Sequence, residues 1–338
     1  MRKRKGRLRI ALPDGHLQEE TGKLFHQAMF ELRGYAKDLR IYRPTIRNES
    51  EIDVKVLRPQ EIPPFVAQGA HDLGITGHDW LEETAASVER LLNLEYGGVR
   101  LVLAMPKPIK ERRKINDTDK FLEYFWGKPI RIVTEYMHLA QDFICGSRFY
   151  KEKMRDEGIG KPALIFPWTP KAEKSPVEII LSWGATEAKP PDDADAIIDN
   201  IGTGRTLESN DLAVVDTVLE ESTAWLIANR DSCVDKNIGA NIRRLETALA
   251  AAVIARKRLH IFANLPKYSK QRLRASRLWR LAQQEPTVVE SGSAARIDLL
   301  IAPCDYHHAL DSLCKLGAKD IITLQPQGVG NPSKAIDN

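Results

Sequence analysis

Short runs of alternating apolar and polar residues separate longer stretches with helical spacing along the first part of the chain. Residues 7–12 and 52–57 have the period of strands, and residues 73–77 form an apolar run that ends in a glycine-bearing loop. Residues 18–32 and a segment that begins at Pro63 have helical spacing. Repeated alternation of strand and helix predicts an α/β fold with a mostly parallel sheet.

A second α/β unit is expected after the charged stretch 107–128, which we interpret as a crossover between domains. Its first strand is predicted at residues 131–134, and residues 139–154 have the spacing of a helix. Further strands are expected at residues 164–166, 179–181, 196–198 and 223–228.

The pattern changes after a strongly helical segment at residues 242–257. Strands are predicted at 258–265, 287–290, 297–302 and 320–324, with helices at 267–282 and 306–316. This β-α-β-β-α-β order is that of a ferredoxin-like domain. We therefore expect a discontinuous domain I (1–107 and 210–242), a domain II (108–209) and a C-terminal ferredoxin-like domain (243–330).

Composition narrows the class of protein only a little. The chain has 338 residues, which suggests two or three domains, and its 50 basic and 46 acidic residues nearly cancel. The basic start, residues 1–5, lacks the aromatic residues of a nucleic-acid arm, so we expect no nucleic-acid partner. No apolar run is long enough to cross a bilayer, and the four cysteines lack zinc or redox spacing. We expect a cytoplasmic protein with reduced thiols and no membrane partner.

The strongest chemical signal lies at residues 195–207, where an apolar strand leads into Gly202-Thr203-Gly204-Arg205-Thr206. Such a turn directs successive backbone N–H groups to one point, which is how many proteins bind phosphate. Asp199, at the end of the strand, is placed to accept hydrogen bonds from ribose hydroxyls. The motif lacks the Gly-Lys-Ser/Thr of a P-loop. The alternative is an ordinary strand–turn–helix connection in which glycine serves only geometry.

An acidic residue beside a Thr-Gly-x-Thr turn resembles the binding loop for phosphoribosyl pyrophosphate, and further motifs make the resemblance more specific. They follow the order seen in ATP phosphoribosyltransferases, at residues 58–63, 72–80, 97–101, 183–187, 285–288 and 316–322. The resemblance extends from Arg9 to about Leu324 and includes the regulatory domain of the family's long form. It implies two periplasmic-binding-protein-like α/β domains around a cleft, a histidine-binding third domain and a homo-oligomer, either a hexamer or a dimer.

The resemblance also implies a reaction, the committing step of histidine synthesis. N1 of the ATP adenine attacks C1 of phosphoribosyl pyrophosphate, and pyrophosphate leaves. N1 already carries a lone pair, so the reaction needs no strong general base, and we assign no catalytic residue. Catalysis should come from positioning and charge stabilisation. Mg²⁺ is the expected cofactor, held mainly by substrate oxygens and water, and its protein ligands are not assigned.

By resemblance, each ligand is assigned a set of residues. The phosphoribosyl pyrophosphate site would comprise Glu187, Asp199, Thr203, Gly204, Arg205 and Thr206. The cleft or ATP site would include Gly15, His16, Arg58, Thr76, Gly77 and Arg100. Inhibitory histidine would lie near Asn264, Thr287 and Ala318. Simpler alternatives stay open: Arg58 could form a surface ion pair, Glu187 could be an exposed loop carboxylate, and Ala318 could serve packing. Asp79 is expected to cap a helix that starts at Trp80.

The first loop departs from the family pattern. The family reads Pro-Lys-Gly-Arg-Leu, whereas this chain has Pro13-Asp14-Gly15-His16-Leu17. A histidine is a weaker and pH-dependent substitute for an arginine that binds phosphate. Asn200 also replaces the usual aliphatic residue after Asp199. These departures motivate an alternative function, a catalytically weak nucleotide or histidine sensor with the same fold. A solute-binding protein of a transporter would share the two-domain architecture but not the Gly202–Thr206 turn.

Overall fold

The computed structural model describes residues 6–168, 175–266 and 269–329. The chain forms two compact units. One is built from residues 9–18 and 53–234, and the other mainly from residues 19–52 and the segment after 235.

The first sheet has the strand order β4-β1-β5-β13-β6. Strands β1 and β5 run parallel, whereas β13 is antiparallel to both β5 and β6. The strand bounds are Leu8–Pro13 (β1), Ile52–Leu57 (β4), Leu73–Gly77 (β5), Glu89–Asn93 (β6) and Ala224–Ala228 (β13). Helices α2 (Ile62–Ala67) and α3 (His78–Thr84) contribute Ile62, Val66 and Leu81 to the apolar core beside this sheet.

The second sheet has six strands in the order β12-β7-β11-β8-β10-β9. Its strand bounds are Val99–Pro106 (β7), Ile130–Thr134 (β8), Ala163–Ile165 (β9), Val177–Leu181 (β10), Ala196–Ile201 (β11) and Leu212–Ser222 (β12). Strands β9, β10, β8 and β11 are mutually parallel, and β7 is antiparallel to β11 and β12. The flanking helices are α4 (Lys107–Arg113), α5 (Thr118–Phe125), α6 (Met137–Gly146), α7 (Arg148–Glu157) and α8 (Arg205–Ser209).

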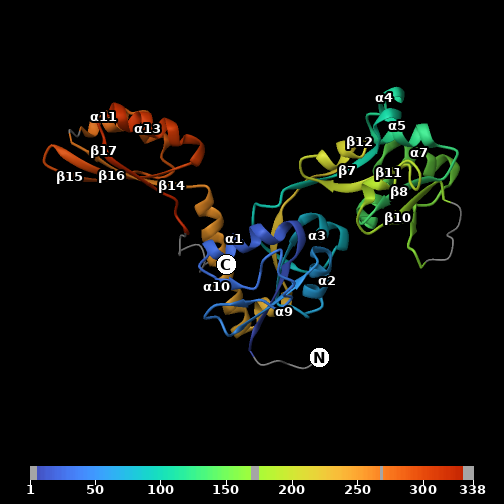
Figure 1. The fold of residues 1–338 in the computed structure, drawn as a ribbon, viewed down its shortest axis with the longest axis horizontal. Helices are drawn as coiled ribbons and strands as arrows, with labels where there is room; N and C mark the ends of the chain where they lie inside the picture. Colours follow the sequence, from blue (N-terminus) through green and yellow to red (C-terminus); the bar gives the residue numbers. More distant parts are fainter. Residues whose placement is uncertain (1–5, 169–174, 267–268, 330–338) are drawn as a thin grey trace. The chain divides into compact units, whose positions relative to one another are not determined.

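Two long strands, β7 and β12, carry the chain into and out of this second sheet and pair with each other (Figure 1). Both therefore belong to the six-stranded sheet, although we predicted domain II only for residues 108–209. The predicted boundaries of domain II depend on whether β7 and β12 are assigned to domain I or to domain II. They stay a prediction.

The other unit contains α1 (Gln18–Gln27), the short pair β2 (Leu32–Arg33) and β3 (Thr45–Ile46), and the long helix α10 (Lys236–Arg256). Asp235 caps α10, because its side chain accepts hydrogen bonds from the backbone N–H groups of Asn237 and Ile238. The Arg244 guanidinium binds both carboxylate oxygens of Glu49, at 2.8 and 2.6 Å, which fixes α10 against this region. The preceding α9 (Arg230–Val234) lies in the unit with the two sheets.

The C-terminal domain has a four-stranded antiparallel sheet in the order β15-β16-β14-β17. Its elements are β14 (Leu259–Leu265), α11 (Lys270–Ala275), α12 (Arg277–Leu281), β15 (Thr287–Ser291), β16 (Ala294–Ile301), α13 (Tyr306–Lys315) and β17 (Lys319–Leu324). Helices α11 and α13 lie along one face of the sheet (Figure 1). The order and pairing are ferredoxin-like, so the expected fold class, two α/β sheets plus a C-terminal βαββαβ domain, is confirmed.

Several predicted elements differ in extent. The helix expected at 139–154 is two helices, because Ser147 has an extended backbone and its hydroxyl caps α7 by accepting from the N–H of Tyr150. The presumed crossover 107–128 contains α4 and α5, the latter capped by Asp117. The helix expected at 18–32 ends at Gln27, and the basic helix expected at 267–282 is α11 followed by α12, with residues 267–268 outside the described part.

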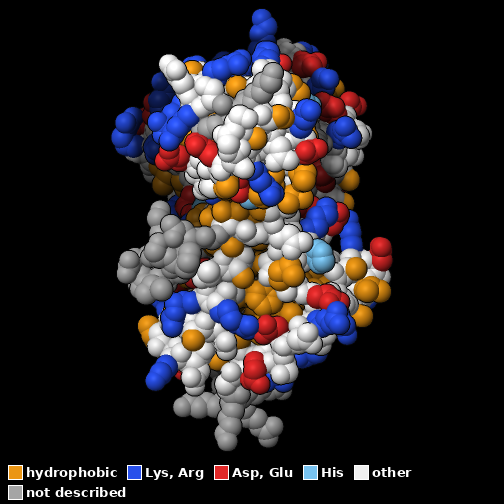
Figure 2. Space-filling view, turned by 90° about the vertical axis from the view of Figure 1, so that its left-hand side faces the viewer, with side chains coloured by type: hydrophobic (Ala, Val, Ile, Leu, Met, Phe, Trp, Pro, Cys, Tyr) orange, Lys and Arg blue, Asp and Glu red, His pale blue; other side chains and the backbone are white. Residues whose placement is uncertain are grey.

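Surface charge matches the balanced composition. On the face drawn in Figure 2, basic and acidic side chains are interspersed. Within the described residues, no helix is long and apolar enough to cross a membrane.

Candidate functional site

The Gly202–Thr206 turn joins β11 to α8. Gly204 has a φ of +77° and precedes the first residue of α8, and Glu208 N–H donates to its carbonyl over 3.2 Å. A left-handed backbone at this position favours glycine. Gly202 and Thr203 are exposed, and so are Arg205 and Thr206. The predicted turn is therefore present at the end of a buried strand, with its backbone open to a ligand.

Asp199 lies two residues before the end of β11 and is largely buried. One carboxylate oxygen accepts the hydroxyl of Thr186, and the other accepts the N–H of Asn200 over 2.7 Å. Burial, together with the charges of Glu187 and Glu135, raises the pKa of Asp199 to about 6, although these two hydrogen bonds act to lower it. The carboxylate is therefore positioned, and its protonation changes near neutral pH.

Glu187 is brought to the same place by a short 3-10 helix, Thr186–Ala188. Ala185 before it has a φ of +49°, and the Thr186 hydroxyl lies 3.4 Å from a Glu187 carboxylate oxygen. Thr186 thus contacts both carboxylates, and the N–H of Gly184 donates to Glu135 over 2.9 Å. The structure brings Glu187 and Asp199 together, and sequence reasoning gave Thr186 no role.

Arg100 lies beside the turn from the neighbouring strand. In the β7–β11 register it pairs with Ile201, and Val102 pairs with Asp199. Because alternate residues of a strand share a face, Arg100 stands on the same face as Asp199. Its side chain is exposed. Among the cleft candidates, Arg100 is the one that the second sheet places next to the phosphate turn.

The first loop and Arg58 lie together at the ends of β1 and β4. Gly15 has a φ of +71°, and the N–H of Asp14 donates to the carbonyl of Leu57 over 2.9 Å. Burial raises the pKa of Asp14, while the nearby charge of Arg58 acts to lower it. Lost hydration lowers the pKa of His16, although the residue is exposed, and the charge of Asp79 opposes this.

Two predicted cleft residues at the end of β5 have structural contacts. The hydroxyl of buried Thr76 donates to the carbonyl of Pro59 over 2.8 Å. Gly77 leaves room for Asp79, because a Cβ at Gly77 would lie 2.1 Å from a carboxylate oxygen of Asp79. If Thr76 and Gly77 contact a ligand, they therefore do so through their backbone groups.

The prediction that Asp79 caps a helix from Trp80 is wrong. Helix α3 starts at His78 with Gly77 as its N-cap, which leaves Asp79 inside the first turn. Its buried carboxylate instead accepts hydrogen bonds from the hydroxyls of Ser222 (2.7 Å) and Tyr136 (2.6 Å). Neither partner was predicted, because they are 143 and 57 residues away in the chain and carry no local motif.

The three regulatory candidates are only partly gathered. Asn264 pairs with Lys319, the residue after Ala318, and its amide donates to Asp320 over 3.1 Å. Ala318 packs against the core of the C-terminal domain. Thr287 lies on β15, an edge strand separated from β14 by β16, and pairs with Asp298. Within one chain, therefore, Asn264 and Ala318 are neighbours and Thr287 is apart from them.

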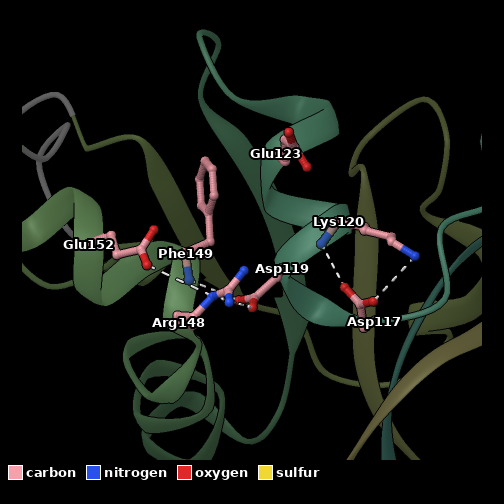
Figure 3. A pocket seen from close by; sticks show the side chains of 7 residues that line it. All are labelled: Asp117, Asp119, Lys120, Glu123, Arg148, Phe149 and Glu152. Atoms are coloured by element: carbon pink, nitrogen blue, oxygen red, sulfur yellow. Dashed lines mark hydrogen bonds and ion pairs between the residues drawn. The ribbon is translucent and has the colours of Figure 1, made fainter.

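A separate hollow of about 470 Å³ lies between α5 and α7 (Figure 3). Its charged side chains are largely paired with one another: Arg148 lies near both Asp119 and Glu152, and the Lys120 ammonium lies 3.7 Å from a carboxylate oxygen of Asp117. Asp119 also accepts the N–H of Phe149 over 2.9 Å. These contacts stabilise the ends of two helices, and the hollow includes none of the predicted site residues.

The site thus combines a backbone turn suited to phosphate with a positioned carboxylate suited to sugar hydroxyls, at the carboxyl edge of an α/β sheet, which is the arrangement expected of an enzyme that acts on a phosphorylated pentose. The family model for ATP phosphoribosyltransferase matches residues 58–251. An ATP phosphoribosyltransferase of Pelotomaculum thermopropionicum is 32% identical over 94% of this chain and 96% of its own length. One of Chlorobaculum parvum is 30% identical over 93% and 94%, respectively. The chain belongs to the ATP phosphoribosyltransferase family, the pentosyltransferases of the first step of histidine biosynthesis, which confirms the resemblance.

Solved structures give weaker likenesses. An ATP phosphoribosyl transferase (HisG:HisZ) complex from Thermotoga maritima aligns at a TM-score of 0.49 and 20% identity, over 72% of this chain and 98% of that one. A Candida albicans protein with the generic periplasmic binding protein fold aligns at a TM-score of 0.42 and 10% identity, over 72% and 69%.

Proposed function

We propose that this protein joins N1 of the ATP adenine to C1 of phosphoribosyl pyrophosphate, with release of pyrophosphate. The observation that carries the proposal is the placement of Asp199 and Glu187 beside the Gly202–Thr206 turn at the end of β11. Backbone N–H groups of the turn, with the hydroxyls of Thr203 and Thr206 and the charge of Arg205, hold the 5-phosphate. Asp199 accepts the ribose hydroxyls, and Glu187 lines the same pocket.

Basic groups around this site stabilise the leaving group. Arg100 stands beside the turn, on the face that carries Asp199, and Arg58 lies at the end of β4 near the first loop. Negative charge grows on pyrophosphate as the ribose carbon becomes oxocarbenium-like, so a positioned guanidinium lowers the barrier. Gly15, His16, Thr76 and Gly77 form the side of the site that receives ATP.

The donor set fits Mg²⁺, the cofactor that we propose. Mg²⁺ prefers oxygen ligands and keeps several waters, and the carboxylates of Asp199 and Glu187, which both lie by the Thr186 hydroxyl, supply such oxygens. Within the described ranges, no three His, Cys, Asp or Glu side chains gather to hold an ion by themselves. The two carboxylates would therefore hold it together with substrate oxygens. When bound, Mg²⁺ neutralises charge on the pyrophosphate.

Regulation and assembly complete the proposal. We propose that histidine inhibits the enzyme by binding to the C-terminal domain near Asn264, Ala318 and Thr287, and that the enzyme works in the cytoplasm as a homo-oligomer, a hexamer or a dimer. Thr287 is separated from the other two within one chain. A histidine site that uses all three residues would therefore have to reach across β16.

The test is pyrophosphate release from ATP, phosphoribosyl pyrophosphate and Mg²⁺, followed together with absorbance of the N1-ribosylated adenine. Turnover that histidine suppresses is the expected result. Folded protein that binds phosphoribosyl pyrophosphate but releases no pyrophosphate would contradict the transferase and support the sensor alternative, with Asp14 and His16 as the departures to restore first.

A further inference from the structure

Two tryptophans, each shortly after a strand of the second sheet, are mostly exposed. Trp168 is 67% exposed and Trp183 is 58% exposed, whereas the other four tryptophans of the chain are buried or partly buried. Large aromatic side chains gain stability from burial, so two adjacent exposed indoles indicate a surface that a ligand covers.

The exposed rings form an ordered row. Phe166 and Trp168 have ring centroids 5.6 Å apart and an interplanar angle of 20°, and Trp168 and Trp183 are 5.8 Å apart at 26°. Phe166 follows β9, and Trp183 follows β10, its parallel neighbour. The row therefore holds flat aromatic faces in nearly parallel planes rather than a disordered cluster.

The row lies at the edge of the sheet that carries the proposed site. Strands β10, β8 and β11 are parallel, so Trp183 after β10 and Asp199 near the end of β11 mark the same carboxyl edge. Ligands of α/β sheets bind at this edge.

The short segment between Trp183 and Thr186 limits the distance from Trp183 to the proposed ribose site. Trp183 is three residues before Thr186, whose hydroxyl donates to Asp199. Three extended residues span at most about 11 Å. Gly184 and Ala185 both have positive φ, +70° and +49°, so the backbone turns between them and the actual span is shorter.

We infer that the face of Trp183 turned away from Trp168, at the end of this row, is a stacking platform for the adenine base of ATP, and that Trp168 supports it from behind. The inference rests on the proposed function, because adenine is the planar aromatic group that this reaction brings to Asp199. Indole faces stack on purines through their π-surfaces. Such stacking fixes the plane of the base, and hence the direction in which N1 points, without a hydrogen bond to the base edge. Trp168 and Trp183 are thus positioning residues for the nucleophile.

Steady-state kinetics of the full-length enzyme tests the platform. Trp183→Ala should raise the KM for ATP about tenfold, the size expected for loss of one base–aromatic stack, and Trp168→Ala, which removes the ring behind Trp183, should raise it less. The KM for phosphoribosyl pyrophosphate should stay within about twofold. Trp183→Phe, which retains a ring, should recover most of the ATP affinity. Tyr42→Ala is the matched control, because Tyr42 is 60% exposed but lies in the other unit.

A binding measurement, which needs no turnover, distinguishes failure of this inference from failure of the proposed function. Equilibrium dialysis with AMP should show about tenfold weaker binding to Trp183→Ala, while tripolyphosphate, which has no base, should bind both proteins equally. If wild-type protein binds AMP through Trp183 but releases no pyrophosphate, the platform stands and the transferase fails. Unchanged AMP binding and unchanged KM for ATP in both alanine variants would overturn the platform. Lost self-association of these variants in sedimentation velocity, with AMP binding intact, would also overturn it, since a second copy would then cover the rings.

Discussion

The hydroxyl of Tyr136 donates a hydrogen bond to the carboxylate of Asp79 over 2.6 Å, which links the segment after β8 to helix α3. The same hydroxyl accepts the side-chain amide of Asn200 over 2.8 Å, and Asn200 follows Asp199 directly. Burial, together with the charge of Asp79, raises the pKa of Tyr136 well above its ordinary value, so the hydroxyl stays protonated and keeps donating. The ring of Tyr136 stacks on Trp80 with centroids 4.3 Å apart.

Tyr136→Phe should therefore affect both stability and substrate binding. Loss of the hydroxyl removes one of the two hydroxyl donors to Asp79 and takes the acceptor from the side-chain amide of Asn200, which should lower the free energy of unfolding by about 1–3 kcal/mol. Because Asn200 adjoins Asp199, the KM for phosphoribosyl pyrophosphate should also rise. Urea denaturation and steady-state kinetics measure the two effects.

Tyr150→Phe is the control for that variant. Tyr150 is buried too, and its hydroxyl donates to the carbonyl of Gly160 over 2.9 Å, without contact to Asp79 or Asn200. It should lose comparable stability while the KM stays unchanged. An equal rise in KM for both variants would show that general destabilisation, and not the Tyr136 link, is responsible.

Asp199→Asn should change how stability depends on pH. The folded-state pKa of about 6 lies above the ordinary value, so between pH 4 and 6 the folded protein holds more protons than the unfolded chain. Wild-type stability therefore falls as the pH rises through this window. Asparagine cannot ionise, so the variant should gain up to about 3 kcal/mol relative to wild type between pH 4 and pH 7.

Thermal unfolding at pH 4.5 and pH 7.5 tests this sign. The variant should also bind phosphoribosyl pyrophosphate poorly at every pH, whereas wild-type binding should weaken only as the pH falls through about 6. A relative stability that does not change with pH would mean that Asp199 has the same pKa in both states.

Gly204→Ala tests the phosphate turn through its backbone. No heavy atom lies within 4 Å of the position of an added Cβ, so the expected loss of about 1 kcal/mol comes from the φ of +77° alone. If the turn relaxes, its N–H groups diverge and the KM for phosphoribosyl pyrophosphate rises. Gly202→Ala is a close control, since it has equal space and no positive φ. Similar kinetics for the two variants would argue against a role for the shape of the turn.

Gly77→Ala should destabilise the protein by about 1–3 kcal/mol. The added Cβ would meet the Asp79 carboxylate at 2.1 Å, and that side chain is held by Ser222 and Tyr136, so it cannot move without losing hydrogen bonds. Gly98→Ala, where no atom lies within 4 Å and φ is not positive, should be nearly neutral. Chemical denaturation of both variants gives the comparison, and a neutral Gly77→Ala would contradict the packing described here.

His16→Arg should improve ATP binding. The pKa of His16 is lowered, so its ring is neutral at pH 7.5 and offers no charge to a phosphate. A permanent guanidinium should lower the KM for ATP by roughly tenfold, the strength of one charge-assisted hydrogen bond, and leave the KM for phosphoribosyl pyrophosphate unchanged. His26→Arg, on the exposed side of α1, controls for added net charge. Equal effects of both substitutions would point to long-range attraction instead of contact.

The sequence predicted the elements whose pattern is local. Residues 52–57 and 73–77 match β4 and β5 because their apolar residues are contiguous or strictly alternating. Strand β12 was missed, because its pairing with β7 shifts register at three places and the burial of its side chains does not alternate. A period-two pattern cannot survive such bulges.

The residues of the candidate site are likewise of two kinds: some lie in one local motif, and others are brought together only by the fold. Asp199 and the Gly202–Thr206 turn lie within eight residues, so the motif itself indicates the site. Tyr136, Ser222 and Asp79 meet only through the fold, and the function of Asp79 was misread because a helix N-cap is the usual local explanation. Polar contacts between residues that are far apart in the chain produce no recognisable spacing in the sequence.

The pairing of β7 with β12 has a consequence for how this protein can be taken apart. Val99 and Ser222 are direct partners, so the chain enters and leaves the second sheet at adjacent points. The segment between them is therefore an insertion whose two ends lie side by side. A short turn that joined residues 98 and 223 would connect the rest of the chain without stretching it. Exchange of this segment between relatives at residues 98 and 223 should therefore yield folded chimaeras when the exchanged segment keeps Tyr136 and Ser222, the partners of the buried Asp79.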